Sequence, residues 1–206
     1  TEAIRAASPI PRNYGSGGIA SYRTFLSDYH YEWFNRAKIV DYYAATNERL
    51  PQYETEAVLR SRTAKFDAIT LLTGWSFDAL DQDEDGVTVR ISKTKGDAHR
   101  TLSARYLVGC DGARSPVREA AGITRTTDPH DRLMALLVFN SRQLDEKLSV
   151  YGDKTIFNAI NPEMNGYWQF LGRVDLDCNW FFHAPVPAGT TRDNFDFHAF
   201  LEKAVG

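Results

Sequence analysis

The sequence is poor in cysteine: its 206 residues contain only Cys110 and Cys178. A secreted disulfide framework needs several closely spaced cysteines, and a structural zinc site usually needs CxxC pairs, so the sequence predicts neither. The five histidines show no HxxxH or HExxH spacing that would place two ligands on one helical face. We therefore expect no metal site, and we expect both cysteines to be small, buried apolar residues.

Long apolar runs and a strong net charge are also missing. The longest apolar stretches, such as Leu133 to Phe139, are far too short to span a bilayer, and no charged-then-apolar signal segment opens the chain. The formal net charge of -3 gives no electrostatic reason to expect nucleic acid or an anionic membrane as a partner. We expect a globular protein of the cytoplasm, and its oligomeric state stays open.

The residues that are present predict a mixture of strands and helices in the first half. Aromatic and β-branched residues dominate from Tyr22 to Tyr43, which favours strands, whereas apolar spacing from Gln52 to Phe66 favours a helix. We expect a short apolar strand over Ala68 to Leu72. Ser76 to Leu80 and Val87 to Ile91 flank an acidic Asp-Gly turn and predict a hairpin.

A buried strand followed by a helix is expected next. The continuous apolar run from Tyr106 to Cys110 is typical of a strand that is buried on both faces of a parallel sheet. A helix should follow, because Ser115 can cap it, Pro116 suits its first position and Gly122 can end it.

Beyond Arg132 the pattern predicts a second, antiparallel layer and a last helix. The expected strands are Leu133 to Asn140, Lys154 to Ile160, Tyr167 to Arg173 and Asn179 to Ala184. In the last stretch, apolar residues recur at helical spacing behind Asp193, which we expect to be the N-cap.

Gly15 to Ala20 formally matches the GxGxxG/A pattern of dinucleotide-binding loops, and Asp41 follows at the distance of a ribose-binding acid. That pattern must follow a buried strand and open a helix. Here Ser8 to Arg12 contains two prolines, and an aromatic, strand-like stretch follows the glycines. We expect a flexible loop instead.

Asp81, Asp83, Asp85 and Gly86 match the first half of a calcium-binding loop. Such a loop needs a bidentate Glu at its twelfth position, which is Ser92 in this sequence. The acidic run is therefore interpreted as a solvated hairpin turn.

The segment YLVGCDGARSPVR, residues 106–118, places Asp111 between the expected strand and the expected helix. Ligands bind at this point in open α/β sheets. A carboxylate can accept hydrogen bonds from both hydroxyls of a ribose, and Gly109 and Gly112 let a ligand approach the backbone. Alternatively, Asp111 only organises an Asx-type turn. The residues alone leave both interpretations open.

This segment resembles the DG fingerprint of the class A FAD-dependent aromatic hydroxylases, the flavoprotein monooxygenases that include para-hydroxybenzoate hydroxylase and phenol hydroxylases. The preceding DEDGVTVRI turn and the following EAAGI fit the family's order, and LPQYETEAVLRSR resembles the family helix whose first Gln reaches the cofactor. The resemblance implies that Asp111, with Gly112 beside it, contacts the ribose of FAD and that Gln52 also reaches FAD. It further implies that Ser115 and Arg118 hold the loop in shape.

The resemblance also implies a fold and an activity. The fold would be of the α/β class, mixed with α+β, and discontinuous: residues 1–21 and 48–132 form part of a Rossmann-like FAD-binding domain, and residues 22–47 and 133–206 form an antiparallel-sheet substrate domain. The whole protein would be a monooxygenase in which NADH or NADPH reduces FAD, and oxygen is then used to hydroxylate a small aromatic substrate. No residue of this chain is singled out as catalytic.

The family's strand-GxGxxG-helix unit and its later GD motif are both absent from this sequence. We therefore expect an internal piece of a longer enzyme, which by itself would bind no FAD and show no activity. Two alternatives stay open: another flavoprotein of the same fold, such as a reductase or an epoxidase, and a cofactor-free α/β binding module.

Several aromatic residues of the antiparallel layer could line a flat substrate pocket, although aromatic residues also alternate along ordinary sheet cores. No substrate residue is chosen among them. They are Phe139, Phe157, Tyr167, Trp168, Phe170, Trp180, Phe181 and Phe182.

Overall fold

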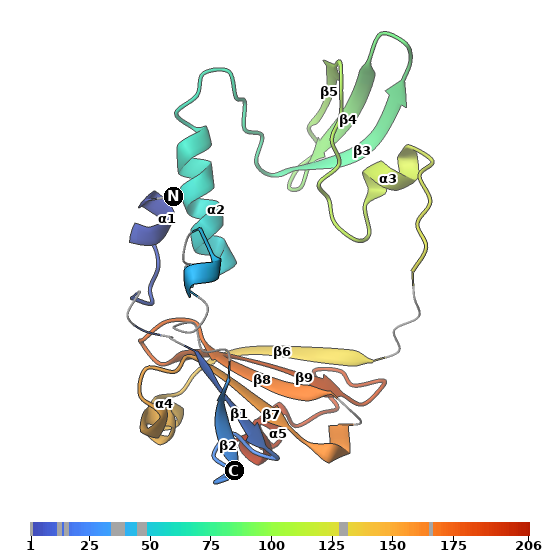
Figure 1. Ribbon diagram of the computed structural model, residues 1–206. Helices are drawn as coiled ribbons and strands as arrows, with labels where there is room; N and C mark the ends of the chain where they lie inside the picture. Colours follow the sequence, from blue (N-terminus) through green and yellow to red (C-terminus); the bar gives the residue numbers. More distant parts are fainter. Residues whose placement is uncertain are drawn as a thin grey trace. The chain divides into compact units, whose positions relative to one another are not determined.

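The computed structural model describes residues 2–206 except 12–13, 15–16, 34–39, 45–48, 128–131 and 165–166. The chain divides into two compact units, a larger one of residues 1–62 and 130–206 and a smaller one of residues 63–129 (Figure 1). Each unit has its own sheet and its own hydrophobic core.

The larger unit is built on a six-stranded sheet with the order β2-β1-β7-β8-β9-β6. All neighbouring strands are antiparallel except β1 and β7, which are parallel. The antiparallel layer predicted after Arg132 is confirmed. The strands are β1 (Gly18–Tyr22), β2 (His30–Trp33), β6 (Leu133–Asn140), β7 (Ile156–Ile160), β8 (Trp168–Arg173) and β9 (Asn179–Val186).

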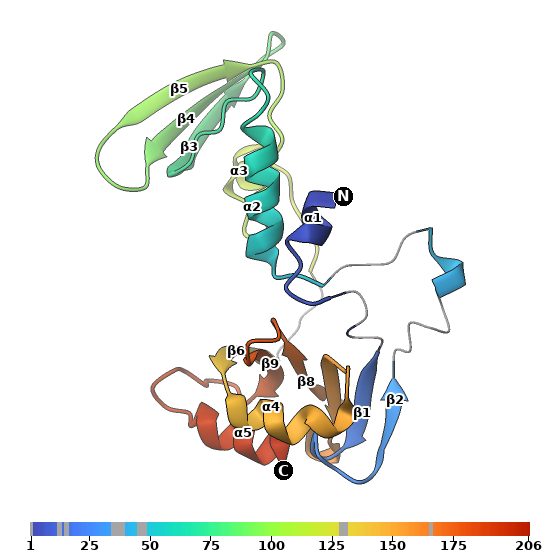
Figure 2. The ribbon, with the colours of Figure 1, turned by 90° about the vertical axis from the view of Figure 1, so that its left-hand side faces the viewer.

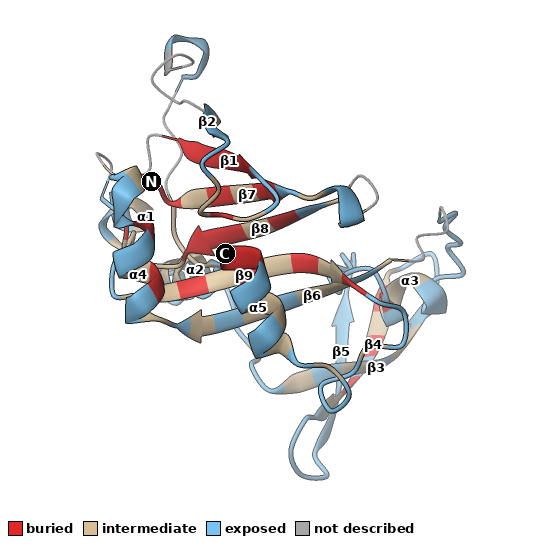
Figure 3. Ribbon diagram, turned by 90° about the horizontal axis from the view of Figure 1, so that it is seen from below, coloured by how far each residue is buried: buried red, intermediate tan, exposed pale blue. Residues whose placement is uncertain are grey.

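Two helices, α4 (Arg142–Leu148) and α5 (Phe197–Val205), pack on one face of this sheet (Figure 2). The alternation along β9 sends Trp180, Phe182 and Ala184 to that face, where all three are fully buried. Figure 3 shows the buried residues gathered on β1, β7, β8 and β9. The hydrophobic core of the larger unit therefore lies between the sheet and these two helices.

The final helix is confirmed, but its N-cap was predicted wrongly. Asp196, not Asp193, caps α5, because its side chain accepts a hydrogen bond of 2.9 Å from the backbone N–H of Ala199. Only a residue directly before the first turn can reach these free N–H groups.

Helix α4 was not predicted. Only Leu144 and Leu148 of its seven residues are buried, so its apolar signal is weak. The Ser141 side chain caps its start, and Asp145 holds it to β8 through an ion pair with Arg173.

Further helical segments of the larger unit, within the described residues, are α1 (Glu2–Ala6), α2 (Gln52–Thr63) and the 3-10 turns η2 (Val40–Tyr42), η3 (Ser149–Tyr151) and η4 (Pro162–Met164). The helix expected from Gln52 is therefore confirmed, and it ends three residues earlier than predicted. Of the stretch predicted to be strand-like, only Tyr22 and His30–Trp33 lie in strands among the described residues, while Val40–Tyr42 is helical.

The glycine-rich segment is partly described. Gly15 and Ser16 lie outside the described residues, but Gly18, Ile19 and Ala20 form the buried start of β1. The prediction of a flexible loop is therefore wrong for these three residues. A strand and not a helix follows the glycines, so a dinucleotide-binding turn does not fit here.

The smaller unit holds a three-stranded antiparallel sheet and a short helix. They are β3 (Trp75–Gln82), β4 (Val87–Lys93), β5 (His99–Ala104) and α3 (Pro116–Ala120). The hairpin is confirmed, and the carboxylate of Asp83 closes its turn by accepting hydrogen bonds from the N–H groups of Asp85 and Gly86. Val87, Val89 and Ile91 form the core on β4.

Two strand predictions in this unit are wrong. Ala68 to Leu72 and Tyr106 to Cys110 lie outside every strand, and Tyr106 and Val108 are 80% and 79% exposed. A β-strand is stabilised by hydrogen bonds to a neighbouring strand, and no described strand pairs with either segment. An apolar run predicts a strand only where such a neighbour exists.

The prediction of buried cysteines is also wrong. Cys110 is exposed because it lies in the unpaired run, and Cys178 is half-buried in the turn between β8 and β9. The backbone of Cys178 adopts a φ of 64°, as tight turns often require.

Candidate functional site

The start of α3 fixes the carboxylate of Asp111. One of its oxygens accepts a hydrogen bond from the Ser115 hydroxyl, and the other accepts one of 3.0 Å from the backbone N–H of Val117. The Ser115 hydroxyl in turn accepts a 3.0 Å hydrogen bond from the N–H of Arg118 and caps the helix. Asp111 therefore does organise the turn between the exposed run and the helix.

The same hydrogen bonds set the charge of this carboxylate. The donors Ser115 and Val117 lower the pKa of Asp111 below its usual value of 3.8. At neutral pH the group is an anion that only accepts hydrogen bonds. Ser115 engages one oxygen and Val117 the other, and because the carboxylate is exposed it can still accept hydrogen bonds from ligand hydroxyls.

Arg118 and the two glycines shape the loop around this anion. The Arg118 guanidinium donates a 3.1 Å hydrogen bond to the carbonyl of Ala113. A Cβ at Gly109 would lie 2.9 Å from the side chain of Val117, so that position has no space for a side chain. A Cβ at Gly112, whose φ is 82°, would meet no atom within 4 Å, so the space beside Asp111 is open.

An apolar hollow of about 610 Å³ adjoins this loop. Its walls come from one face of the three-stranded sheet, including Trp75, Phe77 and Val89, and from residues 107–111. Asp111 belongs to its lining. The hollow therefore combines apolar walls with one anionic hydrogen-bond acceptor, which suits a nucleoside with a flat base and a polar sugar.

Gln52 is the first residue of α2, and its side chain is exposed. Its amide donates a 2.9 Å hydrogen bond to the Glu56 carboxylate one turn later. Gln52 belongs to the larger unit and Asp111 to the smaller one, so their meeting at one cofactor stays a prediction.

The two faces of the six-stranded sheet divide the aromatic residues that the sequence alone could not assign to the core or to a substrate pocket. Phe157, Trp180 and Phe182 are fully buried under the helices. Trp168, Phe170 and Phe181 alternate with buried residues, so they lie on the opposite face. Phe139 packs against the core, and Tyr167 precedes β8 with the guanidinium of Arg132 4.0 Å from its ring centre. The alternation of side chains along each strand therefore distinguishes the core residues from the candidate substrate residues.

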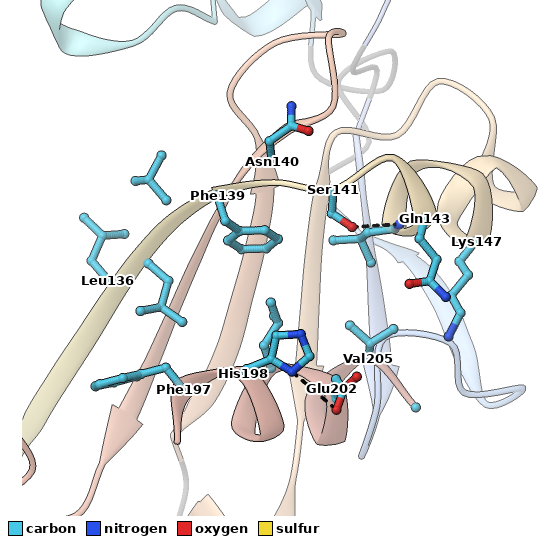
Figure 4. A pocket seen from close by; sticks show the side chains of 15 residues that line it. Leu136, Phe139, Asn140, Ser141, Gln143, Lys147, Phe197, His198, Glu202 and Val205 are labelled. Carbon is cyan, nitrogen blue, oxygen red and sulfur yellow. Dashed lines mark hydrogen bonds and ion pairs between the residues drawn. The ribbon is translucent and has the colours of Figure 1, made fainter. Parts of the chain in front are cut away.

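A second hollow, of about 760 Å³, follows the edge strand β6 and reaches α4 and α5 (Figure 4). Its apolar part includes Phe139, Leu201 and Val205. His198 and Glu202 also line it from α5, and Nδ1 of His198 lies 3.6 Å from a carboxylate oxygen of Glu202.

Neither a metal cluster nor a membrane helix marks the described part of the chain. No group of three His, Cys, Asp or Glu side chains among these residues is placed to hold an ion. No helix within the described ranges combines the length and the apolar character that crossing a bilayer requires.

The family of the chain follows from a comparison with known protein families. The model of the FAD binding domain family matches residues 18–185 and so includes the Asp111 loop and both sheets. The chain belongs to this FAD-binding family. Its resemblance to the FAD-dependent aromatic hydroxylases is thereby confirmed.

Similar proteins include several bacterial hydroxylases. The chain is 39% identical over 122 residues to a putative polyketide hydroxylase of Streptomyces halstedii, which covers 58% of this chain and 21% of the relative. It is 48% identical over 79 residues to the aklavinone 12-hydroxylase of Streptomyces peucetius, which covers 36% of this chain and 15% of that relative. The chain therefore spans about a fifth or less of the length of these relatives.

Solved structures share the fold. The flavin-dependent monooxygenase PieE, in complex with FAD and substrate, superimposes with a TM-score of 0.80 at 20% sequence identity. The match covers 99% of this chain and 36% of PieE. The predicted mixed α/β fold class of an FAD-dependent monooxygenase is confirmed.

Proposed function

We propose that the full-length protein carrying this chain is an FAD- and NAD(P)H-dependent monooxygenase that hydroxylates a small aromatic substrate. The observation that carries this proposal is the anionic, exposed carboxylate of Asp111 at the start of α3 in a chain of the FAD-binding family. The hydroxylase names of its relatives support the reaction class.

The residues of the loop fit the ribose of FAD. Asp111 can accept hydrogen bonds from two ribose hydroxyls, because its own partners leave lone pairs free. Gly112 leaves open space for the sugar to approach. Gln52 has an exposed amide that could donate to a second part of the cofactor.

FAD, when bound, supplies the electron transfer and the oxygen activation that ring hydroxylation needs. The protein's own contribution is to bind and orient. Asp111, Gly112 and Gln52 would hold the cofactor, and the aromatic face of the six-stranded sheet would hold the substrate ring and exclude water. We accordingly assign residues 1–21 and 48–132 to cofactor binding and residues 22–47 and 133–206 to substrate binding.

The test uses the full-length protein. We expect a flavin absorption spectrum, oxidation of NADH or NADPH that is stimulated by a phenolic substrate, and a product heavier by one oxygen atom on the ring. Stimulated oxidation without an oxygenated product would instead indicate a reductase, and oxygen inserted into a carbon-carbon double bond would indicate an epoxidase. A protein that binds no flavin would refute the proposal.

A further inference from the structure

Gly172 on β8 is buried although it faces the open side of the six-stranded sheet, the side opposite α4 and α5. Its strand neighbour Leu171 is fully buried in the core under the helices, and the two faces alternate along a strand. A glycine has no side chain of its own that could exclude water. The cover comes from the ring of Phe181, which is the register partner of Gly172 on β9.

The ring of Phe181 occupies the space in which a side chain at position 172 would stand. A Cβ on Gly172 would overlap the Cε1 and Cζ atoms of that ring and would lie 3.3 Å from its Cδ1 atom. The ring therefore lies against the backbone of β8. It does not cover its other register partner, Val138 on the edge strand β6, which is 69% exposed.

Trp168, Phe170 and Phe181 form a continuous aromatic surface, which we call the aromatic floor. The ring centres of Trp168 and Phe170 are 5.5 Å apart, and those of Phe170 and Phe181 are 5.6 Å apart. Position 172 follows Phe170 on the same face of β8, so a side chain there would displace the third ring of the floor. The missing side chain of Gly172 therefore lets one aromatic surface extend over β8 and β9.

We propose that Gly172 is a positioning residue for the hydroxylation reaction. It lets the Phe181 ring rest on the backbone of β8, and the height of that ring sets the depth at which the aromatic substrate lies. The inference rests on the proposed function and adds the residue that fixes the floor. With alanine at position 172, the ring would have to move by roughly 1 Å to regain an ordinary carbon–carbon separation. A substrate misplaced by that distance can react about 100-fold more slowly.

The test measures turnover by the full-length, FAD-loaded protein with three flat phenols: phenol, 1-naphthol and 1-anthrol. The readouts are kcat, KM and the amount of hydroxylated product formed per NAD(P)H oxidised. We expect Gly172→Ala to lower the kcat for hydroxylation about ten- to hundredfold and to change KM much less. The product per NAD(P)H should fall as well, because a displaced ring misses the position for oxygen transfer even while NAD(P)H is oxidised.

Further variants identify the Phe181 ring as the cause. Phe181→Leu lowers the floor while Gly172 is kept, so it should also reduce the product per NAD(P)H, and it tests the proposal even if Gly172→Ala does not fold. Adding Gly172→Ala to Phe181→Leu should change kcat less than about twofold further, because the ring that the methyl group displaces is gone. Leu171→Val is the matched control: it removes a buried methylene on the helix side and should lower the melting temperature without changing the product per NAD(P)H.

The outcomes separate this inference from the proposed function. If Gly172→Ala folds and keeps the wild-type kcat and product per NAD(P)H, Gly172 does not position the substrate. If Gly172→Ala costs as much in the Phe181→Leu protein as in the wild type, its effect does not pass through the ring and the proposal is wrong. A loss of the same size in Leu171→Val would also overturn it, because the loss would then report general destabilisation. If the FAD-loaded wild-type protein hydroxylates none of the three phenols, the proposed function fails, and the inference fails with it.

Discussion

Replacing Ser115 by alanine is the sharpest test of the Asp111 loop. Ser115 is only 6% exposed. Its hydroxyl accepts a hydrogen bond from the backbone N–H of Arg118 and donates one to the carboxylate of Asp111. Loss of an N-cap costs about 1 kcal/mol of stability. Without the Ser115 donor, Asp111 would lose one of the hydrogen bonds that fix its orientation toward a ribose.

Cofactor affinity separates this effect from a general loss of stability. We expect Ser115→Ala to weaken FAD binding about three- to tenfold, the worth of one net hydrogen bond. Ser141→Ala is the matched control, because Ser141 caps α4 through a 3.1 Å hydrogen bond from the N–H of Leu144. It should cost a similar stability in urea unfolding without changing the affinity for FAD. Equal FAD affinities in the two variants would refute the role of the loop.

Three further predictions concern charge, packing and the second cofactor contact. Hydrogen bonds lower the pKa of Asp111, so the ionised carboxylate stabilises the folded loop fully above about pH 4, and this stabilisation is lost as the pH falls through the lowered pKa. An acid titration of FAD release should show this loss in the wild-type protein and not in Asp111→Asn. Phe182→Ala should destabilise the protein by about 3–5 kcal/mol in chemical denaturation, and Phe181→Ala by clearly less, since only Phe182 is fully buried. Gln52→Ala should weaken FAD binding in a flavin fluorescence titration, whereas Gln143→Ala on α4 should not; an equal effect of both would exclude Gln52 as a contact.

The fold could be predicted from the sequence where a segment has the apolar pattern of a strand and also has a neighbouring strand to pair with. The strands from Leu133 to Val186 alternate or run apolar between clear turns, and each finds an antiparallel neighbour. The cap of α3 was readable because Ser115 and Pro116 occupy the positions that a helix start requires. Tyr106 to Cys110 shows the limit: its pattern is that of a buried strand, but a strand depends on a partner that the pattern does not contain.

The candidate site was predictable only in part, for a similar reason. Asp111 and Gly112 stand in a contiguous motif, so the sequence alone could point to them. Phe170 and Phe181 are 11 residues apart and carry no motif, and their rings lie 5.6 Å apart only because β8 pairs with β9. The period-two alternation with Leu171 and Phe182 would have assigned each to the face away from the core. Their register, which decides that the two rings are neighbours, required the structure.

The two interpretations of Asp111 are therefore complementary. An Asx-type turn uses one lone pair on each carboxylate oxygen, and a ribose would use the others. The turn bonds hold the carboxylate ionised and in a fixed orientation, which reduces the entropy lost when a ligand hydroxyl binds. The structural role of Asp111 thus prepares the cofactor role that we propose for it.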